Sequence, residues 1–180
     1  MRQDANSFYI LQVSDFHISE ESKDSAKKAL TAVTDKINEM NINIRYLIHT
    51  GDIINSKDIR QKIEKQYGAG LEDEKYDERL DEIVKQRFEI AKEIMEEFEK
   101  SLDVMQKNIV ICCGNHDKVR YKTRKKDAFK PFQEFLENVC SHTELTEFHK
   151  LDDLNVFVLN TNDSDDKKVT CVDCENLKKV

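Results

Sequence analysis

Short apolar runs alternate along this chain with longer segments of helical periodicity. Four of the runs are bounded by turn residues, a pattern typical of strands that are buried on both faces. These runs are residues 8–13, 46–50, 108–113 and 154–160. Three segments repeat apolar residues every three or four positions, which indicates amphipathic helices, at 26–40, 78–103 and 129–139. The alternation predicts an α/β fold with the four strands adjacent in one sheet.

The second and third strands are separated by more chain than a helical crossover needs. Residues from about 55–105 are therefore interpreted as an insertion in a single domain that spans residues 1–180. A polar stretch broken by Gly68 and Gly70 comes first, and we expect a loop with a short helix there. The long helix 78–103 follows. Its apolar stripe either packs on the sheet or binds a partner helix, and packing is the preferred interpretation.

Three of the predicted strands end in polar side chains. The first strand is followed by Asp15 and His17, and the second by Asp52. The third ends in a glycine and then presents an amide, an imidazole and a carboxylate at residues 115–117. Ligands bind at the carboxyl ends of parallel strands in open α/β sheets, and carboxylate and imidazole groups suit manganese, iron and zinc. The ordered set therefore predicts a metal site at one edge of the sheet.

The ordered motifs D-x-H, G-D and G-N-H-D resemble those of the calcineurin-like metallophosphoesterase family. In this chain they are Asp15-Phe16-His17, Gly51-Asp52 and Gly114-Asn115-His116-Asp117. The resemblance implies an α/β domain built as a mixed β-sandwich flanked by helices. It also implies a metal-dependent hydrolase of phosphomonoesters or phosphodiesters, with a nucleotide or a nucleic acid among the candidate substrates.

Two divalent metal ions follow from the same resemblance, with Mn²⁺ expected and iron or zinc as alternatives. Asp15 and His17 would hold one ion. Asp52 would bridge both ions, and Asn115 would hold the second. Two ions about 3.5–4 Å apart can clamp the attacking and leaving oxygens of an in-line displacement. A carboxylate suits the bridging position because its charge offsets the repulsion between the cations.

The catalytic roles implied by the resemblance fall on residues 115–117. A metal-activated hydroxide attacks phosphorus, while Asn115 and His116 contact the substrate phosphate. His116 would protonate the leaving oxygen as a general acid, and Asp117 would orient the imidazole ring of His116.

The resemblance covers only the N-terminal portion of the family's domain, which is completed by later histidines, including a G-H-x-H motif. The later histidines of this chain, His142 and His149, lack that context and are interpreted as surface residues. We therefore expect a truncated domain that is a poor catalyst by itself and is completed by a further C-terminal domain or a partner. The alternative is a non-catalytic regulatory or binding module of the same fold, or an inactive fragment of a longer enzyme.

The distribution of charge bears on the substrate. The net charge of −7 argues against a general nucleic-acid-binding protein. Lys118 to Lys130, however, carries seven basic residues and one acidic residue directly after the G-N-H-D motif. This segment is either an ordinary solvated loop or a basic surface that attracts an anionic substrate, nucleic acid included.

The cysteines and the apolar runs bear on location. Five cysteines, an odd number that includes the adjacent Cys112 and Cys113, indicate free thiols in a reducing cytoplasm. Cys171-x-x-Cys174 lacks a second ligand pair, so free thiols are preferred there over a zinc site. No apolar run approaches 18 residues and no signal peptide is recognised, so we expect no membrane association.

Overall fold

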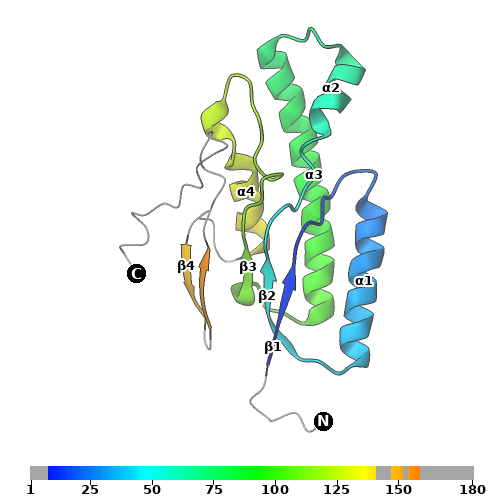
Figure 1. The fold of residues 1–180 in the computed structure, drawn as a ribbon, viewed down its shortest axis with the longest axis vertical. Coiled ribbons are helices and arrows are strands. Elements are labelled where there is room, and N and C mark those ends of the chain that lie inside the picture. The colour runs from blue at the N-terminus through cyan, green and yellow to red at the C-terminus, as the bar shows by residue number, and fades with distance from the viewer. Residues whose placement is uncertain (1–7, 141–146, 152–153, 159–180) are drawn as a thin grey trace.

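A three-stranded parallel sheet organises the fold. The computed structural model describes residues 8–140, 147–151 and 154–158 (Figure 1). The sheet has the order β1-β2-β3 and contains β1 (Tyr9–Val13), β2 (Ile44–His49) and β3 (Ile109–Ile111). Leu47 in the central strand pairs with Leu11 on one side and with Ile109 on the other. These strands confirm the first three predicted runs and place all three carboxyl ends at one edge.

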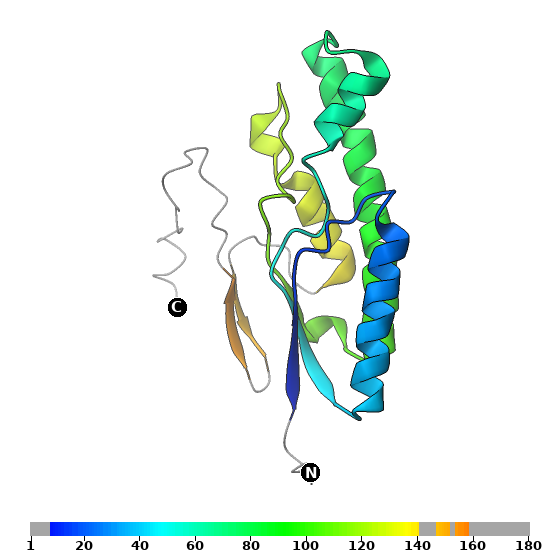
Figure 2. The same ribbon diagram turned by 45° about the vertical axis from the view of Figure 1, so that its right-hand side comes forward.

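The prediction for the fourth run is wrong. Instead of joining the parallel sheet, β5 (Asn155–Val158) pairs with β4 (Glu147–Lys150) in an antiparallel hairpin. The backbone N–H of Leu151 donates to the carbonyl of Leu154 at 2.8 Å, which closes the turn between the two strands. Pairing with the adjacent strand satisfies the β5 backbone locally, and the hairpin lies on the side of the sheet opposite α1 (Figure 2).

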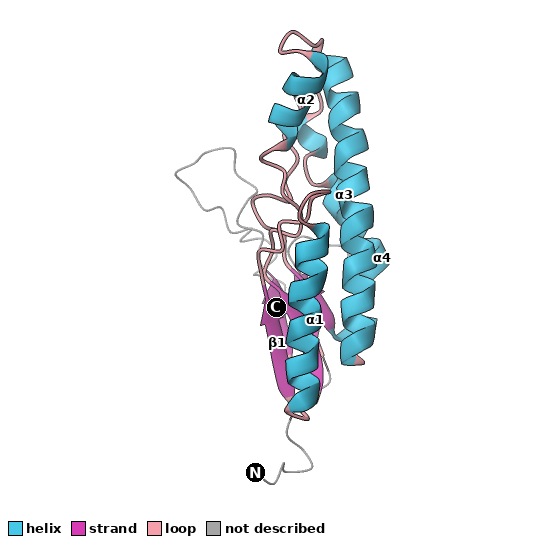
Figure 3. Ribbon diagram, turned by 90° about the vertical axis from the view of Figure 1, so that its right-hand side faces the viewer, coloured by secondary structure: helices cyan, strands magenta, loops and turns pink. Residues whose placement is uncertain are grey.

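Helices cover one face of the parallel sheet (Figure 3). The elements are α1 (Lys23–Glu39), α2 (Ile59–Tyr67), α3 (Asp73–Leu102) and α4 (Lys130–Val139), with 3₁₀ turns at Gln106–Asn108 and Lys125–Asp127. The helix α2 and the first turns of α3 extend beyond the carboxyl ends of the strands (Figure 1). None of the helices in the described residues is long and apolar enough to cross a membrane. Residues 159–180 lie outside the described residues.

The apolar stripe of α3 is buried in the same core as the parallel strands. Its buried members are Leu80, Val84, Phe88, Ala91, Ile94, Met95, Phe98 and Leu102. They share that core with Leu47, Ile109 and Ile111, and each fully buried aliphatic or aromatic side chain contributes about 1.5–3 kcal/mol. This packing confirms the preferred interpretation of the stripe. The helix begins at Asp73, five residues before the predicted start, and Asp73 and Glu74 place negative charge in its first turn, which the helix dipole favours.

One glutamate on α3 is buried although one of its carboxylate oxygens has no hydrogen-bond partner. Glu99 is only 6% exposed, and its Oε1 atom makes no hydrogen bond. Burial, together with the nearby Glu96 carboxylate, raises the pKa of Glu99 to about 8 from an ordinary value of 4.5. Because ionisation is easier in the unfolded chain, the free energy of unfolding falls as the pH rises from about 4.5 to about 8.

Replacement of Glu99 by Gln should therefore stabilise the protein at alkaline pH. The gain in the free energy of unfolding should be small near pH 4.5, should grow to roughly 1–4 kcal/mol at pH 8, and should then level off, since one unit of pKa shift corresponds to about 1.4 kcal/mol. Urea unfolding at a series of pH values measures it. Glu93→Gln, at an exposed position of the same helix, is the control; a gain that is independent of pH would contradict the assignment.

Candidate metal centre

Parallel pairing between β1 and β2 continues beyond the ends of the strands. The N–H of Asp15 donates to the carbonyl of Gly51 at 3.1 Å, and the N–H of His17 donates to the carbonyl of Asp52 at 3.0 Å. An isolated parallel bridge between Ile18 and Ile54 follows. The D-x-H loop and the G-D loop therefore run side by side, which holds their polar side chains in a fixed register.

Three motif residues in these loops have left-handed backbone conformations. The φ angles are +57° at Asp15, +46° at His17 and +58° at Asp52. A positive φ is uncommon for residues other than glycine, although aspartate and asparagine tolerate it best. Each such residue costs about 1–3 kcal/mol, and such strain tends to collect where function requires it. The adjacent Gly51, with φ +102°, continues this turn at no steric cost.

The G-D and G-N-H-D loops touch through their glycines. A Cβ atom built on Gly51 would lie 2.5 Å from the backbone nitrogen of Gly114, and one built on Gly114 would overlap the backbone nitrogen and carboxylate of Asp52. Any side chain at either position would push the loops apart. The two glycines therefore allow the third strand end to approach the second closely.

The three loops bring two imidazoles and a carboxylate together. One ligand atom from each of His17, Asp52 and His116 lies within 4.8 Å of the others. The rings of His17 and His116 meet edge to face with centroids 4.4 Å apart, and the backbone N–H of His116 donates to Oδ1 of Asp52 at 2.8 Å. Two nitrogen donors and one carboxylate oxygen form a set that suits manganese, iron or zinc.

Unsatisfied nitrogens support the fit of a metal to this cluster. The Nδ1 atoms of His17 and His116 are buried and make no hydrogen bond, although buried polar atoms are normally paired. Asp15 stands at the rim, where its Oδ1 atom lies 3.5 Å from Nε2 of His17 while its side chain is 62% exposed. Its carboxylate accepts a hydrogen bond from the Ser14 hydroxyl at 2.5 Å, and this contact, with the nearby imidazoles, lowers the pKa of Asp15.

The geometry of this cluster differs from the predicted ligand set at three residues, of which Asp15 at the rim is one. His116, expected to contact the substrate phosphate and to act as an acid, lies among the candidate ligands. Asn115, expected as a ligand, is exposed and lines a neighbouring hollow with Lys57. The assignment of Asn115 to the second metal stays a prediction.

Asp117 does not make the predicted contact with the His116 ring. Its fully buried carboxylate instead accepts four backbone N–H groups. The donors are Asp52, Ile53, Ile54 and Gly114, at 2.8, 2.8, 3.2 and 2.8 Å. Burial raises the pKa of Asp117 to about 7, and the N–H donors oppose this shift because they bind the carboxylate form. Asp117 therefore fixes the shape of the G-D loop.

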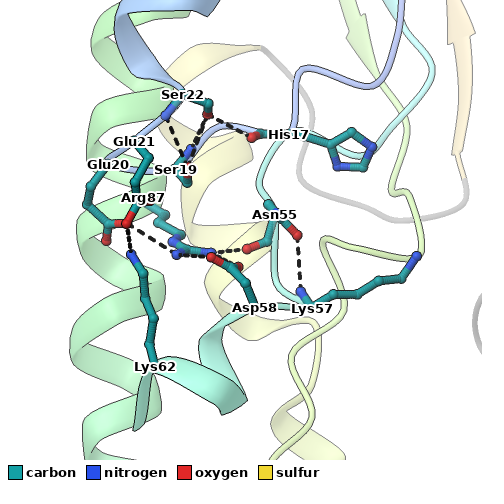
Figure 4. A network of polar contacts seen from close by, with 10 residues as sticks. All are labelled: His17, Ser19, Glu20, Glu21, Ser22, Asn55, Lys57, Asp58, Lys62 and Arg87. Carbon is teal, nitrogen blue, oxygen red and sulfur yellow. Dashed lines mark hydrogen bonds and ion pairs between the residues drawn. The ribbon is translucent and has the colours of Figure 1, made fainter. Parts of the chain in front are cut away.

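A buried arginine on α3 holds the same two loops from the other side (Figure 4). The guanidinium of Arg87 is fully buried and donates to both carboxylate oxygens of Asp58, at 2.6 and 3.0 Å. It also donates to the carboxylate of Glu20 at 3.1 Å and to the backbone carbonyl of Asn55. Glu20 follows the D-x-H motif and Asn55 follows the G-D motif, so one side chain connects α3 to both loops.

The serines after the D-x-H motif extend this network (Figure 4). Ser22 begins α1 but makes no side-chain hydrogen bond to the helix. Its hydroxyl donates instead to the carbonyl of His17 at 3.0 Å and accepts the N–H of Ser19 at 2.9 Å. On the other side, Lys62 of α2 lies 2.7 Å from the carboxylate of Glu20. The backbone at His17 is therefore fixed by helices on both sides.

Arg87 is the supporting residue that the sequence interpretation missed. Its signal was present, because Arg87 stands beside Phe88 and three positions after Val84, within the buried stripe of α3. A charged residue at such a position is almost never buried unless it is paired. The partners, Glu20 and Asp58, come from loops that no helical pattern could connect to α3.

Comparison with known proteins agrees with this geometry. A family model described as calcineurin-like phosphoesterase matches residues 8–178. No curated protein matches the chain significantly.

Replacement of Arg87 by Met should destabilise the protein and weaken its metal site. The change leaves the partly buried carboxylate of Asp58 without its counter-charge and leaves Glu20 with Lys62 alone, so the free energy of unfolding should fall by roughly 3 kcal/mol. Affinity for Mn²⁺ should fall as well, since both ligand loops lose a tether. Urea unfolding and calorimetry measure the two effects. Arg79→Met removes an exposed pair with Glu82 on the same helix and should change stability by less than about 1 kcal/mol; equal losses in both variants would contradict the tethering role.

Proposed function

The chain belongs to the calcineurin-like phosphoesterase family, and from this premise we propose that it hydrolyses phosphomonoester or phosphodiester bonds with divalent metal ions held at the centre described above. The observation that carries the proposal is the convergence of His17, Asp52 and His116 from three loops that follow three adjacent parallel strands. Packing alone gives no reason for two imidazoles and a carboxylate to gather there with unpaired nitrogens.

Asp15 and His17 would hold one ion, Asp52 would bridge two, and Asn115 would reach the second. When bound, the ions would lower the pKa of a coordinated water and offset the charge on the phosphoryl oxygens. We propose Mn²⁺ as the preferred ion, with iron and zinc as alternatives, because the donors mix imidazole nitrogen with carboxylate oxygen.

His116 is proposed to hold a proton for the leaving oxygen. Burial lowers the pKa of His116, and the positive charge of Lys57 and the neighbouring His17 lower it further. The carboxylate of Asp52 acts in the opposite direction. The imidazole is therefore neutral in the free protein near pH 7. A phosphate anion beside the ring would raise the pKa of His116 again, because an opposite charge favours the protonated form. Binding of substrate would in this way prepare the acid.

Access to the centre is open. A shallow hollow of about 450 Å³ is lined by His17 and His116 together with Asn55, Lys57, Asp58 and Gln61. Lys57 is exposed at the mouth of this hollow and brings a positive charge close to the imidazoles. A phosphoester can thus reach the cluster, with its negative charge drawn in by Lys57.

A reducing, cytoplasmic location remains part of the proposal. Within the described residues, Cys112, Cys113 and Cys140 form no disulfide, and burial raises the pKa values of Cys112 and Cys113, which keeps both thiols protonated. Cys171 and Cys174 lie outside the described residues.

Asp52→Asn should weaken Mn²⁺ binding more than any other single change at the centre. The bridging carboxylate loses its charge while the amide keeps the size of the side chain and tolerates the left-handed backbone. Calorimetric titration with Mn²⁺ measures the affinity. Asp103→Asn is a matched control, since Asp103 has φ +56° at the exposed end of α3, away from the ligands. Unchanged affinity in Asp52→Asn would rule out the bridging role.

His116→Ala should slow hydrolysis of a chromogenic phosphodiester by about 10²–10⁴-fold, the usual effect of losing a general acid. The Mn²⁺ content should stay nearly unchanged. Steady-state kinetics measures the rate and elemental analysis measures the metal content of the same preparations. A chelator-treated sample gives the background rate. Loss of metal in parallel with activity would make His116 a ligand instead. Hydrolysis at the wild-type rate in His116→Ala would rule out the general-acid role.

A further inference from the structure

A second hollow, of about 300 Å³, lies next to the metal centre and is strongly basic. Its charged lining comes from Lys57 after β2, Arg60 in α2, and Arg120 and Lys122 after β3. Asn115, the neighbour of His116, also lines it. Lys57 lines this hollow and the open hollow at His17 and His116. The two hollows therefore adjoin each other at Lys57 and at the G-N-H-D loop.

Two of the four cations are neutralised locally and two are not. Arg60 pairs with Glu64 at 2.7 Å, and Lys122 pairs with Asp73 at 2.9 Å. Within the described part of the chain, by contrast, the side chains of Lys57 and Arg120 are exposed and make no hydrogen bond or ion pair. Two like charges on one small hollow favour an anion between them.

The part of the basic segment that follows Arg120 is anchored to α3 at residues 122–124. The backbone N–H groups of Lys122 and Thr123 donate to the buried carboxylate of Asp77, at 2.7 and 2.8 Å. Arg124 donates to Asp81 at 2.6 Å. These contacts neutralise or anchor part of the basic segment, while the exposed side chain of Arg120 lines the hollow.

The lining selects phosphate rather than a nucleobase. The Tyr76 ring lines the hollow, but the ammonium of Lys122 covers its face at 4.4 Å from the centroid. Stacking of a base needs a bare aromatic face. Cations and the Asn115 amide instead offer N–H donors, which suit phosphate oxygens, and the planar guanidinium of Arg120 can bind two of them at once.

We propose that this hollow is a subsite for a second phosphate group, carried by the substrate beside the scissile phosphate and held by Lys57 and Arg120. The inference rests on the proposed function and narrows it to substrates with at least two phosphate groups. A small nucleoside bisphosphate and the backbone of a polynucleotide share this chemistry, and the experiment separates them.

Binding of inorganic phosphate to the metal-free chain tests the subsite without requiring activity. In two-dimensional NMR spectra, the amides of Ser56, Lys57 and Arg120 should shift saturably with phosphate. Arg120→Gln should weaken that binding by about tenfold, the usual scale for a lost charge-assisted hydrogen bond. Lys126→Gln removes the same charge from the same basic segment but outside the lining, and should change nothing.

Absence of saturable shifts, or equal weakening in Arg120→Gln and Lys126→Gln, would overturn the subsite. Dispersed spectra of both variants establish that they fold. Because no metal is present, these results do not depend on whether the protein hydrolyses phosphoesters with Mn²⁺, so the subsite and the proposed function can fail separately.

Thymidine 3′,5′-bisphosphate and a ten-nucleotide thymidine strand distinguish the two sources of the second phosphate. Similar affinities for both ligands, each lost in Arg120→Gln only, would support a small bisphosphate. Tighter binding of the strand that is still lost only in Arg120→Gln would support a polynucleotide entering the same subsite. Strand binding that Arg120→Gln and Lys126→Gln weaken alike would show that the whole basic segment binds a polyanion, and would overturn the proposal.

Discussion

The hydrogen bonds of the buried Asp117 carboxylate are the interaction on which the centre depends. Four backbone N–H groups that no strand or helix could satisfy end on its two oxygens. Buried N–H groups left unpaired would cost about 1–3 kcal/mol each, so Asp117 permits the chain to leave the sheet abruptly after β2 and β3. The close contact of Gly51 with Gly114 also depends on these hydrogen bonds. If the backbone N–H groups of either loop had to be hydrated, water would keep the two loops apart.

Arg87 complements Asp117 with the opposite charge. The carboxylate works from within the loops and the guanidinium from the helix layer, and each joins segments that are remote in sequence. Both are fully buried, and removal of either partner from such an arrangement leaves charges or dipoles without compensation in a medium of low dielectric constant. The loops that carry Asp15, His17 and Asp52 are therefore held by buried hydrogen bonds and ion pairs on two sides, which fits ligands that must be positioned before a metal binds.

Sequence patterns predicted the elements of this structure better than their connections. The runs at 8–13, 46–50 and 108–113 are strands of one sheet because short apolar runs bounded by turn residues allow little else. The run at 154–160 was equally clear as a strand, but its antiparallel pairing with β4 is not encoded in the periodicity. The motifs located the centre, but the hydrogen-bond partners of Asp117 and Arg87 did not follow from them. A motif gives residue types and spacings. It does not say which backbone groups need a donor or an acceptor. The basic segment was ambiguous for the same reason, since α3 carries the acids that neutralise part of it.

The left-handed backbone at Asp15 and Asp52 also limits how the centre can evolve. Outside glycine, aspartate and asparagine are the residues that adopt this conformation at least cost. An exchange of aspartate for asparagine therefore alters the charge of the ligand set while the loop keeps its shape, whereas glutamate, valine or isoleucine would change the backbone as well. Descendants of this chain could adjust which metal they prefer, or lose metal altogether, by single substitutions that leave the scaffold intact. A catalyst and a purely binding relative could accordingly share nearly identical folds and differ only in whether one ligand side chain ends in a carboxylate or in an amide.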